Sequence, residues 1–183
     1  PFNFKISTIN QSDSGGGPTY SGGTFMIDNI VIAETGETDV TRHGVTGQMW
    51  QKVPPAQKMS QTQGAAYCSK LLAPRGLEWR LPTIDELRSL VEVCSDTASG
   101  GGCGVTSECT NPTICRTPVC DGCEKTDTCY WFGKMAGSCI YPYLSSTLSS
   151  SITRDPWWLH YQNAYVGYMK RNGWVRCVLD YAE

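Results

Sequence analysis

A chain of 183 residues, 40% of them apolar, can bury one domain-sized core and carry a smaller attachment. Fifteen basic against 17 acidic residues give a formal charge of −2, and no Lys/Arg cluster is present to follow a phosphate backbone, which argues against a nucleic-acid partner. Every apolar run is far shorter than the roughly 20 residues that cross a bilayer, so no membrane span is expected.

Cysteine usage is the strongest compositional signal. The chain has 10 cysteines, an even number and a density that a reducing cytosol rarely tolerates. We therefore expect an oxidising compartment and a secreted or cell-surface protein.

Residues 1–47 are predicted to form an N-terminal β-hairpin and a connection. Segments 2–9 and 24–32 have strand-like composition and are separated by a Ser/Gly stretch. The second segment, TFMIDNIVI, resembles the closing strand of jelly-roll carbohydrate-binding modules. Three interpretations stay open: an extra hairpin packed on the main domain, the tail of a truncated sandwich, or strands donated to a neighbouring subunit. Residues 34–47 are polar, and the main domain is expected over 48–183.

Two helices are predicted from their start signals. Ser60 and Gln63 form a capping box before a helix over 61–72, which Pro74 and Gly76 then stop. Thr83 and Glu86 form a second capping box before a helix that ends near residue 94. Asp85 and Glu86 are better explained as carboxylates that cap the helix than as a catalytic pair.

The remainder divides into an insertion and a set of strands. Residues 94–139 are rich in Gly, Thr and Cys, and their eight cysteines allow 105 pairings. Segments 48–53, 143–147, 157–161, 164–170 and 174–179 have the aromatic and β-branched composition of antiparallel strands. The predicted class is α+β.

Several motifs occur in the order typical of one bacterial domain family. They are Met49-Trp50, AAYCSKL at 65–71, WRLPTIDELRSL at 79–90, YLSST at 143–147, Trp157-Trp158 and WVRCV at 174–178. From about residue 48 to 178 the chain resembles the family called DUF1566, or the Legionella collagen-like protein C-terminal domain. The resemblance implies a C-type-lectin-like domain, with two helices plus an antiparallel sheet, to which this chain adds the disulfide-rich insertion and the N-terminal β-hairpin.

The resemblance also implies a disulfide framework and bears on calcium. The helix cysteine and the last-strand cysteine of the family would correspond to a bridge from Cys68 to Cys177. The other eight, Cys94, Cys103, Cys109, Cys115, Cys120, Cys123, Cys129 and Cys139, would then pair among themselves. The Glu-Pro-Asn, Gln-Pro-Asp and Trp-Asn-Asp triplets of calcium-dependent lectins are absent, so calcium-independent binding is expected, with no metal and no cofactor.

The segment 157–172 is the candidate ligand-binding surface, because it gathers side chains that exposed binding surfaces favour. The residues assigned to the ligand are Trp157, His160, Tyr161, Asn163, Tyr168, Arg171 and Asn172. Trp158, Tyr165 and Trp174 are assigned to the core. A competing site is a zinc centre built on the C-x-x-C of Cys120 and Cys123 with Cys115 and Cys129.

The expected function is an extracellular binding or adhesion module for a glycan or protein ligand. The rival hypothesis is a structural subunit of a bacterial surface fibre or layer that self-associates through residues 1–33. An enzyme is not expected: His43 and His160 are the only histidines, and no nucleophile elbow or phosphate-binding loop occurs.

Overall fold

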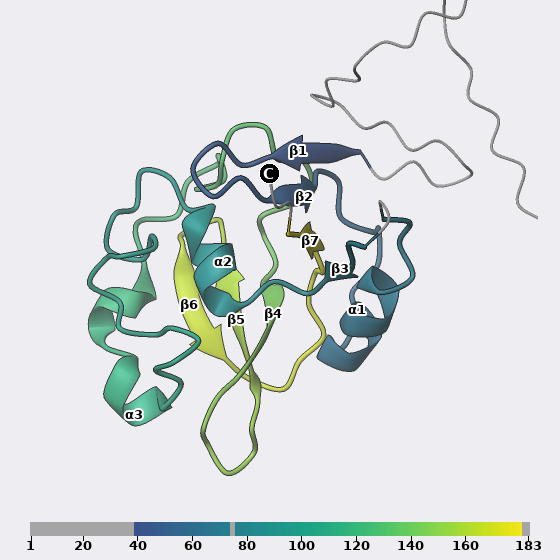
Figure 1. Ribbon diagram of the computed structural model, residues 1–183. Helices are drawn as coiled ribbons and strands as arrows, with labels where there is room; N and C mark the ends of the chain where they lie inside the picture. The colour runs from purple at the N-terminus through teal and green to yellow at the C-terminus, as the bar shows by residue number, and fades with distance from the viewer. Residues whose placement is uncertain (1–38, 74–75, 181–183) are drawn as a thin grey trace, which may run out of the picture.

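The computed structural model describes residues 39–73 and 76–180. The predicted hairpin of segments 2–9 and 24–32, and with it self-association through residues 1–33, lies outside this part of the chain. Within the described residues the fold is α+β, with two antiparallel sheets and a few short helices (Figure 1).

The strands are short and form two sheets. One has the order β1-β2-β7-β3, and the other has the order β4-β5-β6. The first sheet contains β1 (Val40–Arg42), β2 (Met49–Gln51), β7 (Val178–Leu179) and β3 (Trp79–Arg80). The second contains β4 (Tyr143–Leu148), β5 (Pro156–His160) and β6 (Tyr165–Tyr168). In Figure 1, α2 lies against the second sheet and α1 lies beside β3.

The first sheet begins inside the segment that the sequence predicts to be a connection. Val40 pairs with Gln51, and the amide of Lys52 donates to the carbonyl of Asp39 over 2.6 Å. Because β1 pairs along its length with β2, residues 40–42 of the predicted connection belong to the first sheet.

Both predicted capping boxes are confirmed. At α1 (Gln61–Cys68), Ser60 accepts from the amide of Gln63, whose side chain reaches back to the Ser60 amide. At α2 (Ile84–Ser89), Thr83 and Glu86 make the same reciprocal pair. Each helix is therefore started by two hydrogen bonds that satisfy otherwise free amides.

Both helices end earlier than predicted. Helix α1 stops at Cys68 because the chain tightens there into a turn, with Leu71 N bonded to Cys68 O over 3.0 Å. After α2, Val91 forms a bridge with Trp131, and the amide of Phe132 donates to Leu90 O over 2.9 Å. The insertion thus pairs with residues that the 3.6-residue periodicity assigns to a helix.

The final strand is also shorter than the predicted 174–179. Only Val178–Leu179 pair regularly, while Trp174 forms a parallel bridge with Tyr143. The intervening Arg176 is fully buried and donates to the carbonyls of Gln51 and Lys52. Its side-chain bonds take the place of regular strand pairing.

Five disulfides tie the domain together. Cys68 is bonded to Cys177, as the family resemblance implies, and it joins α1 to the residue before β7. The other eight cysteines pair within the insertion and its borders, as predicted. These pairs are Cys94–Cys123, Cys103–Cys120, Cys109–Cys115 and Cys129–Cys139. The zinc hypothesis fails, because Cys115, Cys120, Cys123 and Cys129 are each bonded to another cysteine and cannot supply thiolates.

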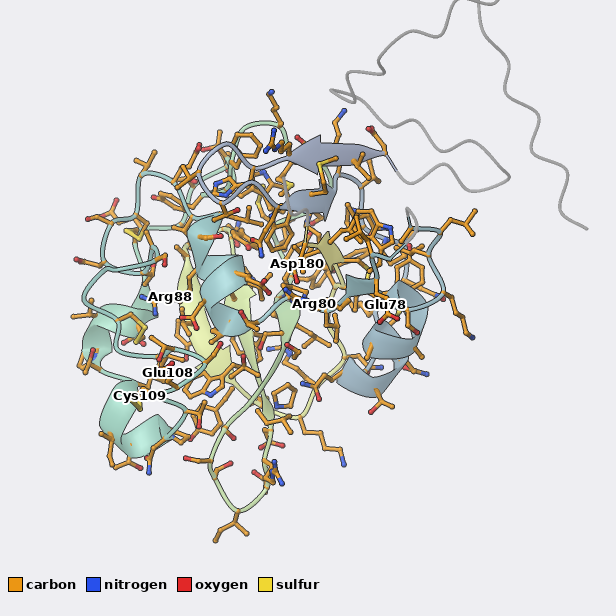
Figure 2. All side chains as sticks on the ribbon, viewed as in Figure 1. Glu78, Arg80, Arg88, Glu108, Cys109 and Asp180 are labelled. Atoms are coloured by element: carbon orange, nitrogen blue, oxygen red, sulfur yellow. A yellow bond between two sulfur atoms is a disulfide. The ribbon has the colours of Figure 1, made fainter. Side chains whose placement is uncertain are left out.

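A buried arginine organises the insertion. Arg88 on α2 is 2% exposed and is labelled in Figure 2. Its Nε and Nη2 donate to the carbonyls of Thr97 and Ala98 over 2.9 Å each, and Nη1 donates to Val105 O. These bonds satisfy carbonyls of a segment without regular secondary structure, so α2 serves as the support on which the insertion folds.

Candidate ligand-binding site

The β5–β6 hairpin has one face toward the core and one face outward. Trp157 pairs with Tyr168 and Leu159 pairs with Val166, whereas Trp158 pairs with Gly167 and His160 with Tyr165. Trp157, Leu159 and Val166 belong to the larger core cluster. Because side chains alternate along a strand, Trp158, His160, Tyr165 and Gly167 occupy the opposite, outward face.

Two arginines and two aromatic rings form a continuous set of contacts on this outward face, here called the Arg–aromatic stack. The rings of Trp158 and Tyr165 are stacked, with centroids 5.3 Å apart and an interplanar angle of 25°. The Arg116 guanidinium lies 4.9 Å from the Tyr165 centroid, and that of Arg171 lies 5.4 Å from the Trp158 centroid. Both distances are within the range of cation–π attraction.

Gly167 makes room for the stack. A Cβ at this position would lie 2.6 Å from Trp158 Cζ2 and 2.7 Å from Tyr165 Cε1. Both atoms belong to rings that are already stacked on each other, so neither can move without separating the pair.

We expect Gly167→Ala to lower the free energy of unfolding by about 1–3 kcal/mol, the usual cost of forcing extra volume into a packed site. Urea denaturation measures the loss. Gly133→Ala is the matched control, because a Cβ at Gly133 meets nothing within 4 Å, and it should change stability by less than about 0.5 kcal/mol. Equal effects from the two substitutions would contradict the packing described here.

The insertion supplies one member of the stack and holds it in place. Arg116 Nε donates to the carbonyl of Val166 over 3.1 Å, and its guanidinium forms an ion pair with Asp121. The amide of Cys123 also donates to Asn163 O over 2.8 Å. The insertion therefore covers the β6 edge and the β5–β6 turn, and it brings a cation to the outward face.

His160 is a neutral group at the margin of this face. Its Nε2 lies 2.6 Å from the carbonyl of Ile140, which fixes Nε2 as the protonated nitrogen. Burial lowers the pKa of His160, and the charges of Lys125 and Arg171 lower it further, against the opposing effect of the Ile140 bond. His160 can therefore contribute shape and polarity at pH 7 but no positive charge.

Two predicted ligand contacts are wrong. Trp157 and Tyr161 are both 0% exposed and belong to the core. The Tyr161 hydroxyl donates to the Leu87 carbonyl over 2.7 Å, and burial raises the pKa of this phenol. The alternation of β5 directs Trp157 inward, and the bond to Leu87 holds Tyr161, the residue after β5, in the core, so neither can touch a ligand on the surface.

The other predicted residues are placed as follows. Arg171 and Asn172 are exposed, and Tyr168 is 37% exposed at the edge of the inward face, with its ring 5.1 Å from that of Trp157. Asn163 is partly buried in the turn that the insertion covers. Among the residues assigned to the core, Trp158 is buried, but it lies in neither core cluster, and Tyr165 and Trp174 are only partly buried.

A second polar feature is an acidic cavity of about 390 Å³. Its lining is Thr46, Gln48, Asp85, Glu86, Ser89, Ser99 and Asp180. Arg80 joins two of the carboxylates, with Nη2 2.6 Å from Glu86 Oε1 and 2.8 Å from Asp180 Oδ1; Figure 2 labels Arg80 and Asp180 side by side. These carboxylates are already bound, so the cluster joins β3, α2 and the end of β7. In the part of the chain that the structure describes, no group of three His, Cys, Asp or Glu is placed to hold a metal ion.

This cluster predicts a loss of stability in acid. Burial, the largest single influence, would raise the pKa of both Glu86 and Asp180. The hydrogen bonds and the charge of Arg80, together with the other hydrogen bonds that the two carboxylates accept, outweigh burial, and both pKa values are lowered. A carboxyl whose pKa is lower in the folded state stabilises the fold above its unfolded pKa, and this contribution is lost as pH falls through its folded pKa.

We therefore expect Arg80→Met to cost about 1 kcal/mol at pH 7, since Arg80 is partly exposed, and less near pH 3. Urea denaturation at the two pH values provides the comparison. Lys52→Met removes the exposed ion pair with Asp39 and should have almost no effect at either pH. A cost of Arg80→Met that does not change with pH would contradict the assignment.

The described residues define a class: a small α+β domain held by five disulfides, in which a structured insertion contributes Arg116 to an Arg–aromatic stack on the outward face of a β-hairpin. The family model for the Lcl C-terminal domain matches residues 39–179, and the chain belongs to this family. The match confirms the family resemblance. The comparisons with curated proteins and with solved structures each gave no match.

The family and the disulfides agree on location. The match to the Lcl C-terminal domain, together with five disulfides and no free cysteine among the described residues, favours an extracellular location. Over the same residues, no helix is long and apolar enough to cross a membrane.

Proposed function

We propose that this domain is a calcium-independent binding or adhesion module that recognises a glycan or protein ligand through the Arg–aromatic stack. The main observation in support of this proposal is that Arg171 is exposed while its guanidinium lies over the ring of Trp158. An aromatic platform with fixed cations offers a ligand contact area and charge with little loss of side-chain entropy.

The proposal includes a C-type-lectin-like arrangement of the domain. Two features support it: the Cys68–Cys177 bridge from the first helix to the end of the chain, and the pairing of the early strand β2 with the last strand β7. In such an arrangement the early and late elements of the domain are joined to each other. The insertion and the β5–β6 hairpin are then left free to form a ligand surface.

Calcium independence is supported by the two carboxylates of the region 130–180. Asp155 accepts a hydrogen bond from Thr153 over 2.7 Å, and Asp180 is bound by Arg80 and Gln48. A calcium ion needs six to eight oxygen ligands, several of them carboxylates, and these two groups are engaged elsewhere.

A non-catalytic role is supported by the environments of the two histidines. His43 is 5% exposed, its Nδ1 lies 2.9 Å from Thr46 Oγ1, and burial lowers its pKa. His160 is bonded to a backbone carbonyl. Both side chains are therefore held by hydrogen bonds within the fold, His43 to a threonine hydroxyl of its own turn and His160 to a backbone carbonyl, which supports a structural part for each.

The test is binding of the purified chain to a glycan array and to a panel of extracellular proteins, in calcium and in EDTA. We expect at least one ligand whose affinity is unchanged by EDTA and falls about tenfold in Arg171→Ala, which corresponds to the loss of one charged contact with the ligand. Lys58→Ala is the control, because Lys58 makes a cation–π contact with Tyr141 outside the stack. Binding that disappears in EDTA, or that Arg171→Ala leaves intact, would contradict the proposal.

A further inference from the structure

The loop between β4 and β5 projects from one end of the molecule and carries a fully exposed aliphatic side chain. Figure 1 shows this loop, residues 149–155, extending beyond the sheet from which it arises. Ile152 at its tip is 104% exposed, the highest value among the large apolar side chains of the described residues. An isoleucine at the end of a projection contributes nothing to the core, and its apolar side chain is fully exposed to the surroundings.

The loop holds this tip in one conformation. Its hydroxyl groups form a chain, with Ser149 Oγ 2.7 Å from Ser151 Oγ, Ser151 Oγ 3.2 Å from Thr153 Oγ1, and Thr153 bonded to Asp155. The amide of Ser149 also donates to Asp155 O over 2.8 Å, closing the base of the loop. The tip is therefore presented on a structured projection, which lowers the entropy lost when it binds.

The surroundings of the tip are apolar and cationic. At the base of the loop, the amide of Met169 lies 3.4 Å from Pro156 O, and the Met169 side chain is 54% exposed. The neighbouring cations Arg154 and Lys170 are exposed. The two cations outnumber the one carboxylate of the loop, that of Asp155, which accepts from Thr153, so the aliphatic point has a net positive charge behind it.

We propose that Ile152 at the loop tip, with Arg154 beside it and Met169 and Lys170 at the base of the loop, docks the domain on an anionic lipid surface. An anionic lipid surface has an apolar interior beneath negatively charged headgroups. Exposed aliphatic side chains can enter the interior, while the neighbouring Lys and Arg side chains contact the headgroups. The tip is convex and narrow, whereas a stable protein partner needs about 800 Å² of complementary surface on each side. A soft bilayer accommodates a projecting side chain without a preformed pocket.

The lipid contact goes beyond the proposed ligand binding and uses other residues. Ile152 and Lys170 are not members of the Arg–aromatic stack, so substitutions at the tip and in the stack separate the two activities. A domain docked on a lipid surface would hold its ligand face close to that surface.

The test is flotation of the purified chain with vesicles of phosphatidylcholine containing about 30% phosphatidylglycerol, compared with phosphatidylcholine alone. We expect binding to the anionic vesicles only, weakened by salt. Ile152→Ser should weaken it about tenfold, and Lys170→Gln should weaken it severalfold. Val45→Ser is the matched control, since Val45 is 90% exposed in the β1–β2 turn, at the other end of the molecule in Figure 1, and it should bind as the wild type.

Three results would overturn the lipid proposal. They are failure of the wild type to bind anionic vesicles, equal binding by Ile152→Ser, and equal loss of binding in Val45→Ser. If Ile152→Ser instead weakens binding to an array ligand while vesicles are ignored, the tip belongs to a glycan or protein site and the lipid proposal is wrong. Loss of array binding in Arg171→Ala with vesicle binding intact would support both proposals separately.

Discussion

Replacing both Cys68 and Cys177 with alanine is expected to lower the free energy of unfolding by about 4–5 kcal/mol. The bridge spans 109 residues, and in the chain-entropy model a loop of this length restricts the unfolded chain strongly. It also lies in the smaller core cluster, with Trp79, Val175 and Leu179. Urea denaturation at equilibrium measures the change.

The short bridge Cys109–Cys115 provides the matched control. It spans only six residues, so its replacement by two alanines should cost about 2–2.5 kcal/mol, roughly half as much. Equal losses from the two double variants would show that the long bridge does not stabilise the domain by closing its frame.

Replacing Arg176 with methionine is expected to cost about 3–5 kcal/mol. Arg176 is 0% exposed, and its guanidinium donates to Gln51 O, Lys52 O and Ala136 O over 2.7, 2.5 and 2.6 Å. It also lies 4.9 Å from the ring centroid of Trp131. Methionine keeps much of the volume but leaves three backbone carbonyls of β2 and the insertion without this donor, and the penalty for that is large in a buried site.

Lys134→Met makes the same change of charge at an exposed position and should alter stability by less than about 0.5 kcal/mol. The comparison is decisive because buried charges are sometimes replaced by apolar groups without loss. If Arg176→Met is as stable as the wild type, the guanidinium does not hold the insertion to the first sheet.

Local signals predicted the starts of elements well and their ends less well. The capping boxes at Ser60 and Thr83 depend on side chains within three residues, so the sequence contains all the necessary information. The end of α2 depends on a bridge between Val91 and Trp131, forty residues apart along the chain. Such long-range pairing overrides helical periodicity, and the residues near the end of the helix contain no sequence signal for it.

The alternation of β5 was present in the sequence, but the assignment of Trp157 to the ligand did not use it. In Pro156-Trp157-Trp158-Leu159-His160, the set containing Leu159 is the more apolar one and faces the core. That parity places Trp157 in the larger core cluster, whereas Trp158, which is buried as predicted, lies on the opposite face of the hairpin. A comparison of the two sets by total hydrophobicity would have found the outward face.

Arg116 could not have been placed in the site from sequence. It lies in the insertion, about fifty residues before Tyr165, and reaches β6 through the local fold that the disulfides impose. Eight cysteines allow 105 pairings, and the choice among them depends on packing around Arg88 and on contacts with the β5–β6 turn. Only a structure can therefore show which residues such an insertion brings to the site.

The measurement that tests the central claim most directly is amide hydrogen exchange of the chain with and without the strongest array ligand. The proposed site predicts new protection in the segments around Arg116 and over 165–172, with the acidic cavity lined by Gln48, Glu86 and Asp180 unchanged. Protection confined to the cavity segments, with none at the Arg–aromatic stack, would contradict the proposed site.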